Sequence, residues 1–306
     1  MSTSTNRKAI ECLEHNEYDA ALALFQEALN ESRDVQSLNN LAWVYYHEEG
    51  DIEGALNLAK EAVELHPTSH FPYSLLGEML VQKERWEEAS AVLADSIAIE
   101  PSREAYNNLA AAKYHLGEWS EAADLFLKSA SPSDYAMYSH IYCLIRLGKS
   151  NEAKHKLDAF SEQDEDFVGE VHAAELYLEL QCFAEAVRWY EKSWNTYYKT
   201  PDWVCRYIYA LVQTNAVEDA LKIAEACINS KQEDIQEEQA EVCSEDWTES
   251  DKASYLIQLE KEKQQYAQIM NRISTGFVPP MKFTTSLSSR CYLFGCSRHN
   301  YPEYAG

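Results

Sequence analysis

The residues best suited to chemistry lie in the last sixteen positions of this 306-residue chain, in the stretch CYLFGCSRHNYPEYAG. Cys291, Cys296 and His299 offer two thiols and an imidazole, which are the ligand types that bind zinc. The stretch has neither a fourth ligand nor the usual short cysteine spacing, so the sequence alone predicts no metal or other cofactor. A disulfide between Cys291 and Cys296 would close a small loop, but it needs an oxidising compartment.

These residues belong to an arm, predicted over residues 276–306, that matches none of the helical patterns before it. Pro279 and Pro280 enforce extended backbone, and the residues that follow are rich in Ser, Thr, Phe and Tyr. A disordered end is one interpretation, although disordered ends are usually poor in aromatic residues. The other is an arm that docks, either in a groove of its own chain or on a partner or modifying enzyme. Its candidate residues are Cys291, Cys296, His299, Tyr301, Tyr304 and Gly306.

Charge and composition limit the classes of partner. The chain has 26 basic and 51 acidic side chains, a formal charge of −25, which disfavours nucleic acid and anionic membrane surfaces. No apolar stretch is long enough to span a membrane, and the first residues do not resemble a secretion signal. Most of the eight cysteines are scattered singly through helical patterns, as small buried residues are. We therefore expect a cytoplasmic protein with reduced thiols.

The elements that must position the arm form an internal repeat. Seven segments such as EYDAALALFQEAL and DIEGALNLAKEAV carry an alanine at the same place, and a second apolar helical stretch precedes each. The alanines are Ala21, Ala55, Ala89, Ala122, Ala153, Ala186 and Ala220, at spacings of 34, 34, 33, 31, 33 and 34 residues. A small residue at this place lets two helices cross closely. The pattern predicts seven helix pairs.

The repeat resembles the tetratricopeptide repeat. The third and fourth units carry the resemblance best, with Tyr73, Leu76, Gly77, Trp86, Ala89 and Pro101 in the third and Tyr106, Leu109, Gly117, Trp119, Ala122 and Phe126 in the fourth. The second unit inserts one residue in its turn, and the sixth and seventh lack the turn glycine. The resemblance covers residues 2–230 and implies an all-α, right-handed superhelical solenoid of about seven helix-turn-helix repeats. The repeated residues are packing positions, so they predict no chemistry.

The resemblance also implies a concave groove lined by the first helix of each pair. The inward positions are rich in aromatic rings and amides, which suit an extended peptide. Asparagines matching Asn40 and Asn108 clamp peptide backbones in related arrays, although such residues also pack helices. The predicted groove residues are Asn39, Asn40, Trp43, Tyr46, Phe71, Glu78, Asn107, Asn108, Tyr114, Tyr135, Tyr138, Tyr142, Arg146, His172, Arg206 and Tyr209.

Two further segments follow the repeats. Residues 231–250 are strongly acidic without sustained apolar periodicity, which predicts a solvated loop. Residues 251–275 have near-heptad apolar spacing, with Ser250 or Asp251 as the N-cap, and predict a helix that caps the array.

The function expected from these features is binding. Because the chain lacks a phosphate loop, a nucleophile elbow and a helical zinc-protease motif, we expect no enzyme activity. We expect a scaffold or adaptor that binds another protein or peptide in its groove, with the arm as a regulatory or presented ligand. Two alternatives are an acidic inhibitor or immunity-like protein that neutralises a basic partner, and a substrate or carrier whose cysteine-containing arm is modified by an enzyme.

Overall fold

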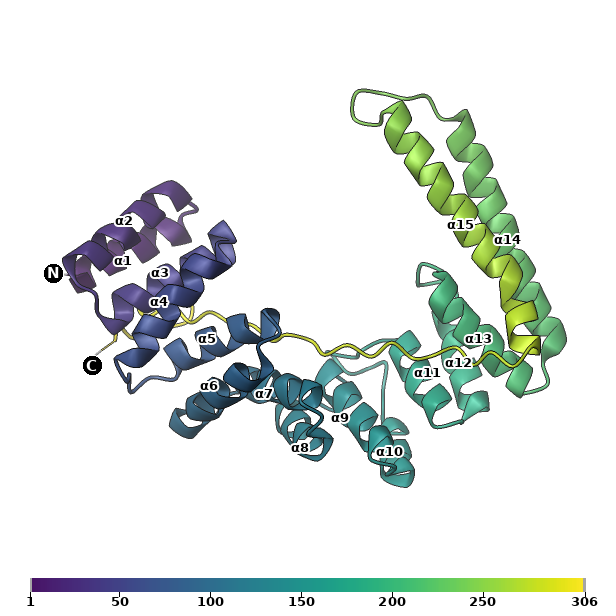
Figure 1. Cartoon of the computed structure of the whole chain (residues 1–306), viewed down its shortest axis with the longest axis horizontal. Helices are drawn as coiled ribbons and strands as arrows, with labels where there is room; N and C mark the ends of the chain where they lie inside the picture. The colour runs from purple at the N-terminus through teal and green to yellow at the C-terminus, as the bar shows by residue number, and fades with distance from the viewer. Residues whose placement is uncertain (1, 305–306) are drawn as a thin grey trace. The chain divides into compact units, whose positions relative to one another are not determined.

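The computed structural model describes residues 2–304, and within them it has fifteen α-helices, one π-helical turn and no β-strand. The predicted all-α class is therefore confirmed. The chain divides into two compact units (Figure 1). Unit 1 comprises residues 1–131, 135–147 and 285–306, and unit 2 comprises residues 132–134 and 148–284. No helix of the described residues has the length and apolar character to cross a membrane.

Unit 1 is built from consecutive antiparallel helices. They are α1 (Ser2–Glu14), α2 (Tyr18–Glu31), α3 (Val35–Val44), the π-helical turn η1 (Tyr45–Glu49), α4 (Ile52–Glu64), α5 (Phe71–Gln82), α6 (Trp86–Ile99), α7 (Arg103–His115), α8 (Trp119–Ser129) and α9 (Tyr135–Arg146). Helix α3 contacts α5, and α5 contacts α7, so three successive first helices line one wall.

Unit 2 continues with α10 (Ser150–Leu157), α11 (Glu170–Glu179), α12 (Phe183–Ser193), α13 (Pro201–Gln213), α14 (Val217–Ala240) and α15 (Glu249–Ser274). Helices α14 and α15 are the longest, and they pack along each other (Figure 1).

The seven alanines have the role that their spacing predicts. Each lies in the second helix of a pair, from α2 to α14, and each is 0% exposed. In the third pair, the backbone of Gly77 on α5 also approaches α6 closely, because a Cβ added to it would lie 2.5 Å from two carbons of the Leu93 side chain. Small residues at these points let large ones, such as Leu93 and Phe25, fill the core.

Turns within the pairs explain two departures from the repeat pattern. Gly117 has φ +80°, and in the sixth and seventh pairs Gln181 (φ 57°) and Asn215 (φ 62°) take this left-handed conformation, as Asn16 (φ 63°) and Glu84 (φ 56°) do in the first and third. The turn thus needs a backbone conformation that glycine favours but does not require glycine. The residue inserted in the second unit is accommodated by η1, a helical turn wider than an α-helix.

The acidic segment is only partly a loop. Helix α14 continues through residues 231–240, so the loop prediction is wrong for that half. The cause is a buried seam in which Lys231 and Ile235 are 6% and 2% exposed, and the Lys231 ammonium lies 3.3 Å from the Glu262 carboxylate of α15. Pairing with α15 supplies the contacts that the segment's own sequence does not show.

The helix predicted over residues 251–275 is α15, which begins two residues earlier. Its N-cap is Thr248 rather than Ser250 or Asp251, because Thr248 and Asp251 bond each other's backbone N–H in a capping box.

The close approach at Gly77 predicts that replacing this glycine by alanine changes stability in the direction opposite to the usual one. A glycine-to-alanine change in a helix ordinarily stabilises a protein by about 0.5–1 kcal/mol. Gly77→Ala should instead destabilise the chain by about 1–3 kcal/mol, because the new methyl group overlaps Leu93. Urea unfolding of Gly77→Ala, Leu93→Ala and the double variant checks this. The double variant should lose less stability than the sum of the losses of the two single variants, by about 1 kcal/mol. A loss equal to that sum would contradict the overlap.

Candidate peptide-binding groove and C-terminal arm

The C-terminal arm of unit 1, residues 285–304, lies along the wall formed by α3, α5 and α7. Figure 1 shows it as the yellow chain beside these helices. It has no helix or strand over residues 285–304, yet Tyr292, Leu293 and Phe294 are each at most 4% exposed. An extended segment with buried backbone needs hydrogen-bond partners from the wall.

Two buried asparagines supply these partners in pairs of bonds. The Asn40 side chain donates to the Phe294 carbonyl oxygen at 3.0 Å and accepts from the Phe294 N–H at 2.9 Å. The Asn108 side chain holds Ser288 in the same way, donating to its carbonyl at 2.7 Å and accepting from its N–H at 2.8 Å. A side-chain amide can do this because it carries both a donor and an acceptor.

The neighbouring asparagines add one bond each. Asn39 donates to the Tyr292 carbonyl and Asn107 to the Ser286 carbonyl, both at 2.7 Å. Asn40 and Asn108 are 68 residues, or two repeats, apart, and the arm residues that they hold are six apart. The arm therefore advances three residues per repeat, in the direction opposite to the repeats. Three extended residues span about 10 Å, close to the spacing of packed helices.

The repeat between them binds the arm through an aromatic cluster. At the position equivalent to Asn40 it has Ser74, whose hydroxyl bonds Ser96 at 2.7 Å. Phe71 lies against three arm rings, with centroid distances of 5.7 Å to Tyr292, 5.0 Å to Phe294 and 4.9 Å to Tyr301. Burying each such ring contributes about 1.5–3 kcal/mol, so this repeat anchors the arm by apolar contact.

Glu78 is the buried carboxyl of the wall, at 1% exposure. Burial raises its pKa to about 7, although hydrogen bonds from Ser289 of the arm and Tyr46 act in the opposite direction. His47 lies 3.9 Å away, and burial lowers its pKa to about 4. Tyr46 and His47 both come from η1, so the inserted residue places them over Glu78. Near pH 6 both members of this pair are uncharged.

Sequence reasoning missed the residues that hold the tip of the arm. Glu14 accepts bonds from the Ser297 N–H and hydroxyl at 3.1 and 2.7 Å, and these lower the pKa of its carboxyl. Gln36 accepts from the Tyr304 N–H at 2.9 Å. Both residues lie in the first two repeats, and their ordinary polar types gave no signal because only the path of the arm brings it to them. Gly306 lies outside the described residues.

The other predicted residues of unit 1 have contacts of several kinds. The Trp43 ring lies tilted against His47, with centroids 4.6 Å apart, and the Tyr114 ring centroid lies 6.2 Å from that of Tyr142. Tyr135 and Tyr138 form a pair at 5.1 Å, and Tyr138 is 1% exposed, so it is a core residue. Arg146 lies over the ring of Trp119 at 4.7 Å.

In unit 2, the predicted residue Arg206 meets the arm. Arg206 donates to the Pro280 carbonyl at 3.1 Å and forms a buried ion pair with Glu175. Burial lowers the pKa of His172, and the positive charge of Arg206 acts in the same direction. Tyr209 contacts Phe183 edge-on at 6.1 Å.

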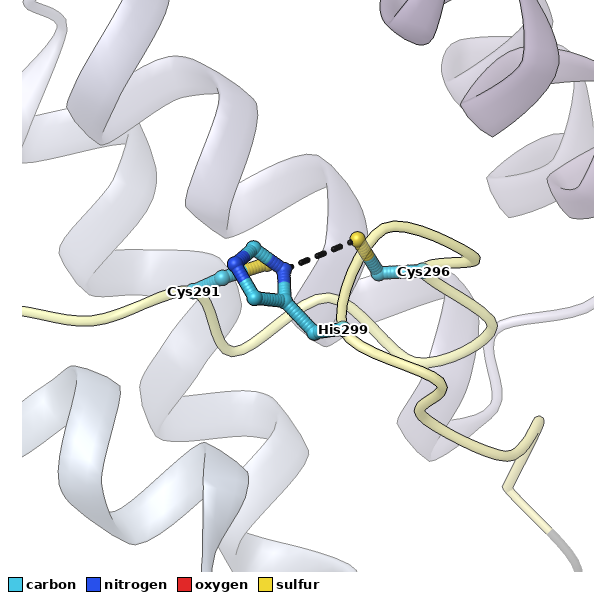
Figure 2. A group of neighbouring side chains, drawn as sticks. All are labelled: Cys291, Cys296 and His299. Carbon is cyan, nitrogen blue, oxygen red and sulfur yellow. Dashed lines mark hydrogen bonds between the residues drawn. The ribbon is translucent and has the colours of Figure 1, made fainter.

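The cysteines and histidine of the arm come together near its tip. The ligand atoms of Cys291, Cys296 and His299 all lie within 4.8 Å of one another, and the Cys296 sulfur is 3.2 Å from His299 Nδ1 (Figure 2). Both thiols are free, and burial raises the pKa of Cys291 to about 12. The convergence was not predicted, because it depends on the fold of the loop between Cys291 and His299.

Removing either paired asparagine should release one point of the arm. Asn40→Ala should speed hydrogen exchange of the Phe294 amide, and Asn108→Ala that of Ser288, by about 5- to 150-fold, since each loses bonds worth about 1–3 kcal/mol. Asn57→Ala, an exposed asparagine on α4, is the matched control. Unchanged exchange in both groove variants would show that these amides do not hold the arm.

The pair of Glu78 and His47 predicts opposite pH dependences. Because the pKa of Glu78 rises from 4.5 to about 7, its stabilisation is present below pH 4.5 and lost as pH rises through 7. Because the pKa of His47 falls from 6.5 to about 4, its contribution is present above pH 6.5 and lost as pH falls through 4. Urea unfolding between pH 4 and 8 measures both effects. The free energy of unfolding of the natural chain, relative to that of Glu78→Gln, should fall as pH rises. Relative to that of His47→Gln, it should increase as pH rises. If both differences change with pH in the same direction, the pair is not uncharged.

Comparisons with known proteins agree with the repeat geometry. Three family models, each described as a tetratricopeptide repeat, match residues 6–70, 46–113 and 103–131. No curated protein shows significant similarity to the sequence.

Parts of the chain resemble solved structures of two proteins, MamA and YrrB. A crystal structure of MamA protein has 19% identity and a TM-score of 0.46, and the match covers 65% of this chain and 97% of that one. A structure of YrrB, titled a TPR protein with an unusual peptide-binding site, has 20% identity and a TM-score of 0.46, covering 65% of this chain and 91% of that one. The family models and the helix pairs confirm the resemblance read from the sequence, and residues 6–131 of the chain consist of tetratricopeptide repeats.

Proposed function

We propose that this protein is an interaction scaffold that binds an extended segment of another protein in its groove, and that its own arm occupies the groove over α3, α5 and α7 until such a segment displaces it. The carrying observation is the matched spacing of Asn40 and Asn108 with Phe294 and Ser288. Binding, rather than catalysis, is the activity that this geometry supports.

Backbone recognition makes the groove usable by other segments. The six hydrogen bonds between the four asparagines and the arm all go to main-chain atoms, so they do not depend on the side chains of the occupant. Specificity comes from the repeat between them. An occupant needs aromatic or large apolar residues two positions apart, as Tyr292 and Phe294 are, to pack on Phe71.

Charge favours an occupant with a basic residue before its aromatic pair. Arg290 of the arm lies 3.6 Å from Glu104 of α7, and the whole chain has a formal charge of −25. A partner segment with Arg or Lys three or four residues before its second aromatic residue would repeat this contact, whereas an acidic segment would be repelled.

The covalent attachment of the arm sets the competition. A segment tethered by a flexible linker acts at an effective concentration in the millimolar range. A free segment must therefore bind the groove more tightly than the arm does, or bind after the docking of the arm has been weakened. This arrangement makes the arm an autoinhibitor.

Eight unpaired cysteines fit a reducing compartment, and we place the protein in the cytoplasm on that ground.

Competition by a synthetic peptide tests this proposal in the full-length chain. A labelled peptide of residues 283–304 should bind the natural chain weakly. A chain with Tyr292→Ala and Phe294→Ala, whose own arm has lost its anchors, should bind it at least about 10-fold more tightly, because the competing state is depopulated. Fluorescence anisotropy measures both affinities.

Two controls make the result specific. Leu287→Ala changes an arm residue that is 38% exposed and should leave peptide affinity as in the natural chain. Adding Asn40→Ala and Asn108→Ala to the anchor-free chain should abolish the gain. Equal peptide affinity of the natural and anchor-free chains would refute the autoinhibited groove, and a gain that survives loss of both asparagines would place the binding site elsewhere.

A further inference from the structure

The loop at the tip of the arm gathers three metal-ligating side chains. Among the described residues 2–304, Cys291, Cys296 and His299 are the one group of three or more such residues whose ligand atoms converge. They follow a Cys-x4-Cys-x2-His spacing, and Figure 2 shows their side chains turned toward one another. The other cysteines do not belong to this group; they lie on helices, in the turn before α12 and in the loop after α14.

We propose that Cys291, Cys296 and His299 form a binding site for one Zn²⁺ ion, and that the bound ion fixes the arm in its docked conformation. Two sulfur ligands and one imidazole are a donor set that zinc accepts, with a water molecule as fourth ligand.

The distances fit this ion after small adjustments of the side chains. Tetrahedral zinc with Zn–S near 2.3 Å and Zn–N near 2.0 Å has ligand atoms about 3.5–3.8 Å apart. The three ligand atoms lie within 4.8 Å of one another, and the Cys296 sulfur and His299 Nδ1 are already 3.2 Å apart. To reach this geometry, the Cys296 sulfur and His299 Nδ1 would move apart by about 0.3 Å, and ligand atoms that are more than 3.8 Å apart would move closer.

The backbone of the loop holds these side chains in place. The Tyr301 N–H donates to the Cys296 carbonyl at 2.9 Å, and the Gly295 N–H donates to the Pro302 carbonyl at 2.9 Å. Gly295 has φ +86°, so the turn that brings Cys296 back toward Cys291 needs a conformation that other residues rarely adopt. The site is therefore preformed by the fold of the arm.

A cavity gives the ion access and an open position. It has a volume of about 130 Å³, and its lining includes all three ligands together with Glu14, Trp43 and Arg298. The Glu14 carboxylate is held by Ser297, so it shapes the cavity wall rather than completing the ligand set. A water molecule in this cavity would be the fourth ligand, as in zinc sites with three protein ligands.

The charge of the complex suits a partly buried position, in which Cys296 is buried, Cys291 is half-buried and His299 is exposed. Cys296 is 4% exposed, and two thiolates around one Zn²⁺ make the site neutral overall. The imidazole of His299 is further oriented by Tyr301, with ring centroids 5.4 Å apart and nearly parallel planes, and Tyr301 in turn packs on Phe71.

Zinc binding would strengthen docking because the ligands flank the anchors. Cys291 precedes Tyr292 and Phe294, and Cys296 and His299 follow them, so one ion closes a loop of nine residues around the segment held by Asn39 and Asn40. A closed loop has fewer undocked conformations than an open one. This second half of the inference rests on the proposed function; the zinc site does not.

Cobalt titration of the full-length, reduced and metal-free chain tests the site directly. Co²⁺ replaces zinc in such sites and gives a sulfur-to-cobalt charge-transfer absorption. We expect one Co²⁺ per chain, displaced by one Zn²⁺. Cys291→Ser, Cys296→Ser and His299→Ala should each weaken binding by at least about 100-fold. Cys243→Ser, in the loop after α14, is the matched control and should bind as the natural chain does.

Hydrogen exchange of the Phe294 amide, with and without Zn²⁺, tests the effect on docking. Zinc should slow exchange in the natural chain and not in Cys296→Ser. Absence of stoichiometric Co²⁺ and Zn²⁺ binding, binding that survives loss of the three ligands, or binding of Cu⁺ alone would overturn the zinc site. Stoichiometric zinc binding with unchanged exchange would keep the site and overturn its effect on the arm. If only the peptide-competition experiment of the proposed function fails, the autoinhibited groove is refuted and the zinc site is not.

Discussion

Burial of an extended backbone is the constraint on which the rest of the structure depends. Tyr292, Leu293 and Phe294 lose almost all contact with water. The wall must therefore replace the hydrogen bonds that buried peptide groups can no longer make with water. Asparagine is suited to that role because its short side chain offers one donor and one acceptor in a plane. The same solution appears at Asn40 and at Asn108, two repeats apart, because the periodicity of the helices sets the periodicity of the contacts.

The repeat between these two clamps shows how a regular array acquires selectivity. Its Ser74 cannot reach the arm backbone in the way that asparagine does, and Phe71 and Glu78 contact the arm there instead. The π-helical turn contributes as well, because one inserted residue brings Tyr46 and His47 over the Glu78 carboxyl. Irregular turns of this kind often mark functional positions in helices.

The arm itself combines two kinds of order. Between residues 286 and 294 it takes its conformation from the wall, through main-chain bonds that any extended segment could make. After Phe294 it folds on itself, through the turn at Gly295 and the bond between Tyr301 and Cys296. In the proposed function a competitor would replace the first part, whereas the second is a small structure of its own. A metal ion bound at the tip, as we propose, would therefore affect what the groove binds.

Sequence periodicity by itself determined the helix pairs. The seven alanines, the turn glycines and the prolines after α4 and α6 identify the elements, because the packing of one helix on its neighbour is a local requirement repeated along the chain. The aromatic and amide residues of the groove were also predictable in part, since Asn39, Asn40, Phe71, Asn107 and Asn108 lie at fixed places in each repeat. The packing of the second half of α14 on α15 was not predictable, because Lys231 is buried there but does not count as an apolar residue in the sequence pattern.

Only the tertiary structure decided what meets the groove and what the tip of the arm can do. From the sequence, an arm that is disordered and an arm that is docked were equally compatible with the same residues, because the contacts join positions more than 250 residues apart. Glu14 and Gln36 became arm-binding residues, and Cys291, Cys296 and His299 became a cluster, only through the path of the chain. Local spacing fixes secondary structure, but the convergence of distant side chains depends on the free energy of the whole fold.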